Sequence, residues 1–156
     1  MQNKINSLKL RMKDNNVDLV VLGPGTHMNW LLGFNPYPDE RPCMLLIGKE
    51  KEAFLMPSVN AEDARKRTDI AINSWNDENG PDQALKEALL YIGESTAKHI
   101  AIDEAMRSHF ALIVIEALPN PTYEFTTSTI GALRMRKDQT EFINLKENAL
   151  IDDRAM

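Results

Sequence analysis

Two spacings of apolar residues alternate along this chain, one typical of helices and one typical of strands. Ile5, Leu8 and Met12 recur at intervals of three and four residues, which predicts a first helix with one buried face that ends near 15–16. Residues 18–22 form a short apolar run of the kind found in buried strands. The predicted strands cover 18–22, 42–47, 52–56, 70–75, 99–102 and 123–126. The predicted helices between them cover 26–32, 60–67, 81–92 and 104–118.

The order of these elements indicates the fold class. Strands interleaved with helices favour an α/β protein in which helices cover a sheet. The runs at 42–47 and 52–56 are joined by the short segment Gly48-Lys49-Glu50-Lys51, which predicts a hairpin. Because a hairpin pairs its strands antiparallel, we expect a mixed sheet rather than a fully parallel one.

A last helical pattern occupies the end of the sequence. Asp138 followed by Glu141 has the spacing of a capping box, which predicts that a helix begins there. Apolar residues then recur at helical spacing, at Phe142, Leu145 and Ala149. No Gly or Pro stops this helix, and a helix of about 12–15 residues is marginal alone in water. We therefore expect the chain to be cut inside the first helix of a following domain.

Composition and charge narrow the class of protein. The chain has 156 residues, of which 43% are hydrophobic and 26% charged, as in ordinary soluble globular domains. A formal net charge of −5 gives no electrostatic reason to expect nucleic acid or an anionic membrane as a partner. The apolar runs are far shorter than the ~20 residues that span a bilayer, and the polar start is unlike a secretory signal. Cys43 is the single cysteine, so we expect no disulfide and predict a cytoplasmic location.

A glycine-rich segment follows the first predicted strand. Gly23-Pro24-Gly25-Thr26 lies between a strand and a helix, which is the setting in which loops bind phosphate. The dinucleotide-binding pattern needs a third glycine where the chain has Met28, and the Gly-Lys-Ser/Thr of a P-loop is missing. The segment therefore favours a tight strand-to-helix connection over a nucleotide site.

Three histidines are the first candidates for site chemistry, and none has a second histidine four residues away on a helix. His99 begins a predicted strand, which favours a structural role, and His109 lies on a predicted helix, which favours solvent exposure. His27 lies in the glycine-rich turn and is the candidate that we place at the edge of a site.

The carboxylates and Cys43 give no catalytic centre. Asp152 and Asp153 are adjacent on a helix, so their side chains diverge by about 100° and cannot share one metal ion. Asp103 and Glu104 are expected to begin a helix, where negative charge suits the helix dipole. Cys43 has no obvious base beside it and is expected to be a small buried hydrophobe. We predict no metal site and no catalytic residue in this chain.

The segment after Gly33 combines aromatic residues with proline. Three prolines between 36 and 42 stiffen it, and exposed aromatic residues in stiff loops favour recognition. In the alternative interpretation, Trp30 and Phe34 belong to the core and Tyr37 alone is exposed.

Two segments at opposite ends of the chain, taken together, resemble a known family. Residues 17–22 and 27–34, V-D-L-V-V-L and H-M-N-W-L-L-G-F, resemble the D-A-L-L-V … N-V-x-Y-L-T-G-F signature of the creatinase/prolidase N-terminal domain. Trp30 stands where the signature has Tyr, and Leu32 where it has Thr. Residues 133–142, L-R-M-R-K-D-Q-T-E-F, are similar to the L-R-x-I-K-S-x-E-E-I junction that opens the catalytic domain in that family. The α/β order between them agrees, so the resemblance covers essentially the whole chain.

The resemblance implies a domain organisation. Residues 1–132 would form a three-layer α/β/α domain with an RNase-H-like mixed sheet. Residues 133–156 would form the junction and the truncated first helix of a missing catalytic domain. In the family that domain has the pita-bread fold, and its two Asp, one His and two Glu hold a pair of Mn²⁺, Co²⁺ or Zn²⁺ ions. None of those ligands falls within residues 1–156, so the resemblance implies no cofactor in this chain.

The function implied by the resemblance is that of a non-catalytic N-terminal domain in a metal-dependent Xaa-Pro dipeptidase or aminopeptidase. In these peptidases a metal-bridged hydroxide attacks the peptide bond before proline, so the substrates are proline-containing di- or oligopeptides. The family also implies a homodimer in which the N-terminal domain lends a loop to the entrance of the partner's active site. On this chain that hypothesis points to Tyr37, Asp39 and Arg41, with His27 at the same entrance.

Two alternatives stay open from the sequence. Pita-bread relatives include creatinase and other hydrolases of small C–N compounds. Domains of this type also occur as interaction modules in proteins that have lost catalysis. A free-standing nucleotide-binding domain is disfavoured by the missing third glycine and by the open-ended last helix.

Overall fold

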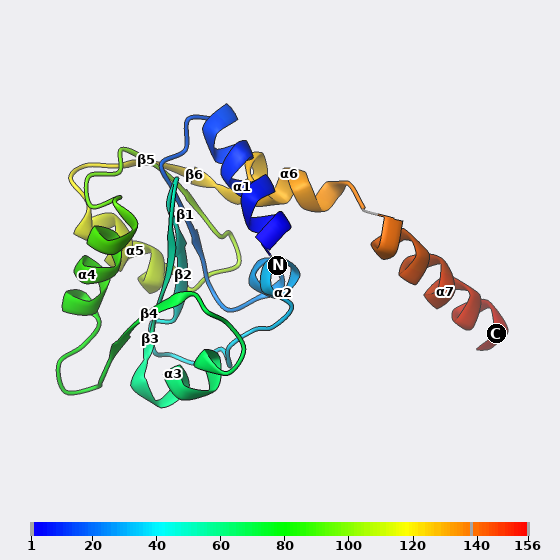
Figure 1. The fold of residues 1–156 in the computed structure, drawn as a ribbon, viewed down its shortest axis with the longest axis horizontal. Helices are drawn as coiled ribbons and strands as arrows, with labels where there is room; N and C mark the ends of the chain where they lie inside the picture. The colour runs from blue at the N-terminus through cyan, green and yellow to red at the C-terminus, as the bar shows by residue number, and fades with distance from the viewer. Residues whose placement is uncertain (1, 138, 156) are drawn as a thin grey trace.

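The computed structural model describes residues 2–137 and 139–155, and Figure 1 shows their arrangement. The helices are α1 (Gln2–Asp14), α2 (Thr26–Leu32), α3 (Ser58–Arg65), α4 (Asp82–Ile92), α5 (Ser108–Ala117), α6 (Ile130–Met135) and α7 (Gln139–Ala155). The strands are β1 (Leu19–Leu22), β2 (Met44–Ile47), β3 (Glu52–Pro57), β4 (Ala71–Trp75), β5 (His99–Ile102) and β6 (Thr122–Phe125). A 3₁₀ turn, η1 (Thr126–Ser128), follows β6. Within the described residues, no helix has the length and apolar character that crossing a membrane requires.

In this described part of the chain, six strands form one sheet in the order β4-β3-β2-β1-β5-β6. β2 runs antiparallel to β1 and β3, while the pairs β3–β4, β1–β5 and β5–β6 are parallel. The β2–β3 hairpin aligns Leu45 with Phe54, and the β1–β5 pair aligns Val20 with Ala101. The predicted hairpin and the mixed sheet are therefore confirmed.

Helices cover both faces of the sheet, so the fold has three layers (Figure 1). Successive side chains of β1 point to opposite faces, as the pleat of a strand requires. Val20 and Leu22 join a core with α1, α2 and α3, whereas Leu19 and Val21 join a core with α4 and α5. The two cores confirm the α/β/α arrangement.

One predicted helix begins later than expected. α5 starts at Ser108, because the segment after β5 forms a turn first. Oδ1 of Asp103 accepts the backbone N–H of Ala105 at 2.9 Å, a side-chain bond that competes with helix formation. The prediction that Asp103 and Glu104 begin a helix is therefore wrong.

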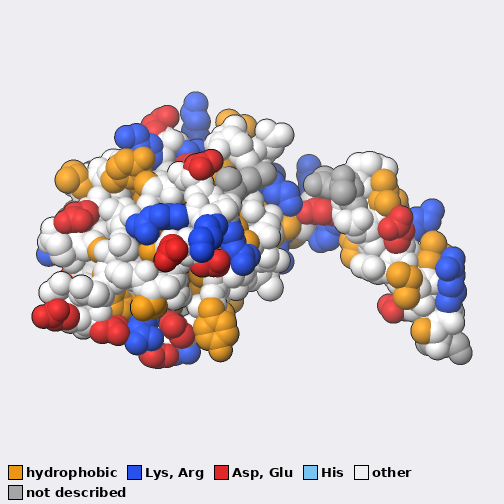
Figure 2. Space-filling model, turned by 60° about the horizontal axis from the view of Figure 1, so that its bottom comes forward, with side chains coloured by type: hydrophobic (Ala, Val, Ile, Leu, Met, Phe, Trp, Pro, Cys, Tyr) orange, Lys and Arg blue, Asp and Glu red, His pale blue; other side chains and the backbone are white. Residues whose placement is uncertain are grey.

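α7 extends away from the body of the domain (Figures 1 and 2). Its apolar side chains lie at the surface: Phe142 is 57% exposed, Leu145 52% and Ile151 61%. The helix predicted at the end of the sequence is present, with its apolar residues uncovered. Asp138, the residue predicted to cap it, lies outside the described residues.

Candidate functional site

Residues that directly follow three parallel strands meet at the carboxyl ends of those strands, which form one end of the sheet. β1, β5 and β6 are neighbours in the sheet, so Gly23, Asp103 and Thr126, which come directly after them, lie at this end. The chain leaves β1 toward β2 and leaves β5 toward β6, so the two connections diverge between β1 and β5. In α/β folds, such a divergence at the carboxyl ends of strands is the usual position of a binding site.

The glycine-rich connection after β1 is tightly packed. A Cβ atom on Gly23 would lie 2.8 Å from Cγ of Met106, so the turn after β5 approaches closely only because residue 23 has no side chain. Gly25 donates its backbone N–H to Oδ1 of Asn35 at 2.7 Å. Both contacts support the prediction of a tight connection rather than a phosphate loop.

His27, in the first turn of α2, is buried at this end of the sheet with 6% of its surface exposed. Its Nδ1 lies 2.7 Å from Nη1 of Arg134, which comes from α6. A guanidinium group can only donate hydrogen bonds, so Nδ1 is the acceptor and the ring hydrogen is on Nε2. Nε2 in turn lies 3.1 Å from Oε1 of Glu104, to which it donates. His27 therefore links α6 to the turn after β5.

Glu104 is also held from the carboxyl end of β6. Its Oε2 accepts a hydrogen bond from Oγ1 of Thr126 at 2.6 Å. Burial raises the pKa of Glu104, but the hydrogen bonds from Thr126, from its own backbone amide and from His27 outweigh that effect and lower the pKa below its ordinary value. Glu104 is thus an ionised acceptor for two neutral donor side chains.

Asp103 completes the polar cluster and is 3% exposed. Burial raises the pKa of Asp103 above its ordinary value, although hydrogen bonding to Ala105 and the proximity of His27 act in the opposite direction. Ligand atoms of His27, Asp103 and Glu104 all lie within 4.8 Å of one another, a donor set that suits a divalent ion. However, Arg134 holds the ring hydrogen on Nε2, which leaves no lone pair facing the two carboxylates. This arrangement favours a closed hydrogen-bond network over a metal site.

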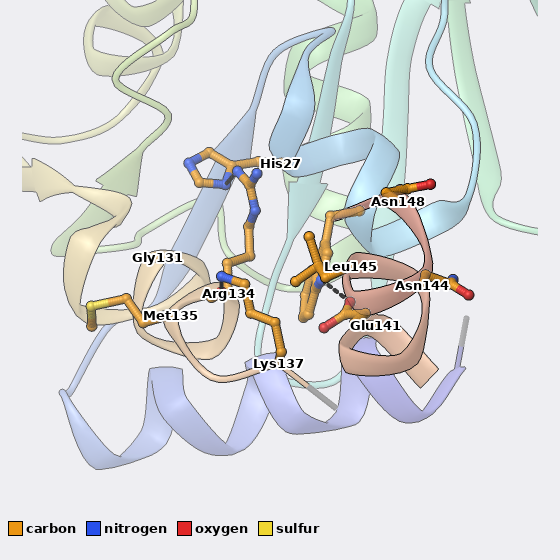
Figure 3. Close-up of a pocket in the computed structure, with 10 residues that line it drawn as sticks. His27, Gly131, Arg134, Met135, Lys137, Glu141, Asn144, Leu145 and Asn148 are labelled. Carbon is orange, nitrogen blue, oxygen red and sulfur yellow. Dashed lines mark hydrogen bonds between the residues drawn. The ribbon is translucent and has the colours of Figure 1, made fainter. Parts of the chain in front are cut away.

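A pocket of about 490 Å³ opens beside this network, between α2, α6 and α7 (Figure 3). Figure 3 shows Arg134 reaching from α6 toward His27, with the side chain of Lys137 nearby. The lining residues are His27, Trp30, Gly131, Arg134, Met135, Lys137, Glu141, Asn144, Leu145 and Asn148. The pocket therefore joins this end of the sheet to the start of α7.

Glu141 anchors the start of α7 on one wall of this pocket. Its Oε1 accepts a hydrogen bond from the indole Nε1 of Trp30 at 2.6 Å and pairs with Nζ of Lys4 at 3.1 Å. Nζ of Lys4 also lies 4.1 Å from the ring centroid of Trp30, within the range of a cation–π contact. These contacts join α1, α2 and α7 through one carboxylate.

The proline-containing loop lies at a different place. Tyr37 is 78% exposed and lines a separate pocket with Phe34. Asp39 accepts the backbone N–H of Arg41 at 2.8 Å, and two nitrogens of the Arg41 guanidinium each lie 2.9 Å from the carboxylate of Asp77. This pairing with Asp77 raises the pKa of Arg41 and lowers that of Asp77. The structure therefore groups Tyr37, Asp39 and Arg41 on one loop and assigns His27 to the other pocket.

The remaining candidate residues lie as predicted. Trp30 and Phe34 pack against the core while Tyr37 is exposed, which is the distribution of burial that the alternative interpretation expects. Cys43 is 1% exposed, and burial raises the pKa of its thiol to about 12, so it is an inert buried side chain. His99 begins β5, and His109 is exposed on α5.

Comparison with known proteins identifies the family. The sequence profile described as the Creatinase/Prolidase N-terminal domain matches residues 4–136, which is most of the chain. The chain belongs to this family. No curated protein sequence is similar enough to count as a match.

Solved structures share the fold of this creatinase/prolidase N-terminal domain. A prolidase from Thermococcus sibiricus is 20% identical with a TM-score of 0.82, and the match covers 98% of this chain and 42% of that one. A dipeptidase from Pyrococcus horikoshii OT3 is 24% identical with a TM-score of 0.77, covering 88% of this chain and 38% of that one. The N-terminal domain of an X-Pro dipeptidase from Streptococcus pyogenes is 16% identical with a TM-score of 0.73, and the match covers 81% of this chain and 95% of that one. The chain thus spans about two-fifths of the two larger proteins, and the likeness establishes the fold.

Sequence reasoning on this family member found His27 but missed the residues around it. Glu104 is 77 positions away and Arg134 is 107 positions away, so no local spacing links them. One signal was present: Asp103 and Glu104 directly follow a predicted strand, at the end where α/β folds place polar side chains. The prediction that Asp103 and Glu104 begin a helix led away from this signal.

Proposed function

We propose that this chain is the non-catalytic N-terminal domain of a metal-dependent Xaa-Pro peptidase, a dipeptidase or an aminopeptidase. Membership of the Creatinase/Prolidase N-terminal domain family supports this proposal. The larger prolidase from Thermococcus sibiricus supports it further, because more than half of that chain has no counterpart here. In this proposal the two divalent metal ions and the binding of proline-containing peptides belong to a second domain, in a cytoplasmic protein.

The observation that carries the proposal is the contrast within α7. Glu141 fixes the start of the helix to Lys4 and Trp30, while Phe142 and Leu145 stay more than half exposed. An exposed apolar helix face of this kind marks a surface that packs on another unit. We assign residues 133–156 to the junction and first helix of the catalytic domain, and residues 1–132 to the domain that orients it.

Cleavage assays test the proposal directly. The 156-residue chain and its full-length parent would be assayed with Mn²⁺ on the dipeptide Ala-Pro and the tripeptide Ala-Pro-Ala. We expect activity in the parent only, with the preferred peptide identifying a dipeptidase or an aminopeptidase. A parent that hydrolyses creatine but neither peptide would replace the proposal with the creatinase-like alternative. A parent that hydrolyses neither the peptides nor creatine would replace it with the interaction-module alternative. Activity in the 156-residue chain alone would contradict the non-catalytic assignment.

We also propose that the loop bearing Tyr37, Asp39 and Arg41 borders the active-site entrance of the partner subunit in a homodimer. The exposure of Tyr37 in a loop that contains three prolines supports this role, because a stiffened loop can present one side chain to a substrate. Tyr37→Ala in the parent should change the ratio of tripeptide to dipeptide cleavage while the metal content stays constant. Tyr91→Ala, which alters a half-exposed tyrosine on α4, is the matched control. An unchanged ratio in Tyr37→Ala would exclude the role.

A further inference from the structure

Arg134 presents an unusual guanidinium group at the base of the pocket between α2, α6 and α7. Nη1 donates to two neutral acceptors, Nδ1 of His27 at 2.7 Å and Oγ1 of Thr26 at 3.2 Å. Among residues 2–137 and 139–155, no carboxylate forms a salt bridge with this guanidinium. An arginine has five N–H donors in a planar fork that matches a carboxylate. The neutral contacts fix the group in place without neutralising its charge.

The rest of the lining favours a small anion with an apolar body. Lys137 adds a second positive charge, and its Nζ donates to the backbone carbonyl oxygen of Arg134 at 2.9 Å. Asn144 and Asn148 also line the pocket, and Figure 3 shows their amide groups directed away from Arg134. Trp30 and Leu145 supply apolar surface. The pocket volume of about 490 Å³ is within the range of small-molecule sites.

One acidic side chain also lines the pocket. Glu141 directs its Oε1 to the ammonium group of Lys4 and the indole N–H of Trp30. Lys4 compensates its charge, and Arg134 and Lys137 leave the pocket with an excess of positive charge. Glu104 lies across the imidazole of His27 from Arg134 and is not a lining residue.

We propose that this pocket binds a small organic carboxylate with an apolar body, with Arg134 as the carboxylate receptor. Trp30 and Leu145 provide contact for the apolar part of such a ligand. Inorganic phosphate fits less well, because it would gain nothing from the apolar wall. This proposal concerns the chain by itself and does not rest on the catalytic activity of a parent protein.

The two tryptophans make the test specific. The Trp30 indole N–H lies at the pocket, whereas the Trp75 indole N–H is buried and donates to the carbonyl oxygen of Pro42 at 2.9 Å. In ¹H–¹⁵N spectra of the 156-residue chain titrated with Ala-Pro, the Trp30 indole signal should shift and saturate while that of Trp75 stays in place. Ala-Pro-amide, which lacks the carboxylate, should leave both signals unchanged. An equal response to both peptides, or no response to Ala-Pro, would overturn the proposal.

Variants identify the receptor. Arg134→Met should weaken the binding of Ala-Pro by about 10- to 100-fold, as expected for loss of charge-assisted hydrogen bonds. Arg136→Met is the matched control, because Arg136 lies in the same segment but does not line the pocket, and its affinity should be unchanged. Equal affinity in Arg134→Met and wild type would refute the assignment, as would a phosphate titration that shifts Trp30 at lower concentration than Ala-Pro does. Should Arg134→Met fail to fold, Arg134→Lys, which keeps the charge but loses the fork, takes its place with a weaker loss expected.

Discussion

α1 and α7 have similar apolar spacing and opposite surroundings. In α1, Ile5, Leu8 and Met12 are completely buried against the sheet. In α7, Phe142 and Leu145 are more than half exposed, and the contacts of Glu141 with Lys4 and Trp30 join the start of the helix to the body. The comparison shows that helical spacing identifies an apolar face without identifying what covers it. It also predicts that the two helices respond differently to the same substitution.

The largest contrast should come from matched truncations of leucine. Leu8→Ala leaves a cavity in the core beneath α1 and should lower the free energy of unfolding by about 2–5 kcal/mol. Leu145→Ala in the 156-residue chain truncates a side chain that is 52% exposed and should change it by less than about 0.5 kcal/mol. Urea denaturation followed by circular dichroism measures both. A comparable loss in Leu145→Ala would mean that α7 packs on the body.

A second contrast lies within the glycine-rich connection of the body. Gly23→Ala places a methyl group 2.8 Å from Cγ of Met106 and should lower the free energy of unfolding by about 1–3 kcal/mol, as overpacking does. Gly25→Ala is the control, because the nearest atom to its Cβ would be the Gly23 carbonyl oxygen at 3.9 Å. Thermal denaturation of the two variants should rank Gly23→Ala well below Gly25→Ala. The reverse ranking would contradict the close approach described here.

The amino-terminal end of the sheet should give the body a pH dependence. Burial raises the pKa of Asp18, but the Lys49 ammonium and the backbone N–H groups of Lys98 and His99 outweigh it, so the pKa is lowered in the folded state. The unfolded chain then binds more protons at acid pH, and the stabilisation is present above the ordinary pKa of 3.8 and disappears as pH falls through the folded value. Asp18→Asn should therefore lower the free energy of unfolding by about 1–3 kcal/mol at pH 7 and by progressively less toward pH 2.

Glu94 is the internal control for that measurement. Burial raises the pKa of Glu94, so its ionisation opposes folding as pH rises above 4.5. Glu94→Gln keeps an acceptor for the backbone N–H of Lys49 and removes the buried charge, so stability at pH 7 should be equal to or greater than that of wild type. Urea midpoints from pH 2 to pH 7 measure both variants. If Asp18→Asn lowers the stability by the same amount at every pH in this range, the ionised carboxylate is excluded as the cause.

The smallest effect is expected at the anchor of α7. Glu141→Gln keeps an acceptor for the Trp30 indole and removes the ion pair with Lys4. In this pair the Glu141 side chain is 26% exposed and the Lys4 side chain 33%. Partly exposed pairs of this kind contribute about 0–1 kcal/mol. The unfolding midpoint should barely move, while the Trp30 indole resonance should shift because its acceptor changes. An unmoved resonance would show that the anchor is absent in solution.

The outcome of the sequence predictions depended on how far apart the interacting residues are. The strand over 18–22 and the hairpin were predicted correctly, because runs of buried residues and a short connection are local signals. The start of α5 was predicted wrongly, because the side chain of Asp103 closes a turn that competes with the helix dipole argument. His27 was named as a site residue together with the 35–41 loop, but its partners, in the turn after β5 and on α6, could not be named because they are distant in sequence.

By itself, the sequence determined the α/β class, most strand positions, the presence of α7 and the family, because each depends on spacing or on motifs within short segments. The tertiary structure decided the strand order, the partners of His27, the pocket beside Arg134 and the exposure of the apolar face of α7. Those features depend on contacts across as many as 137 positions, such as Lys4 with Glu141. Such contacts form only where the packing of helices on both faces of the sheet brings distant side chains together, and local apolar patterning does not specify them.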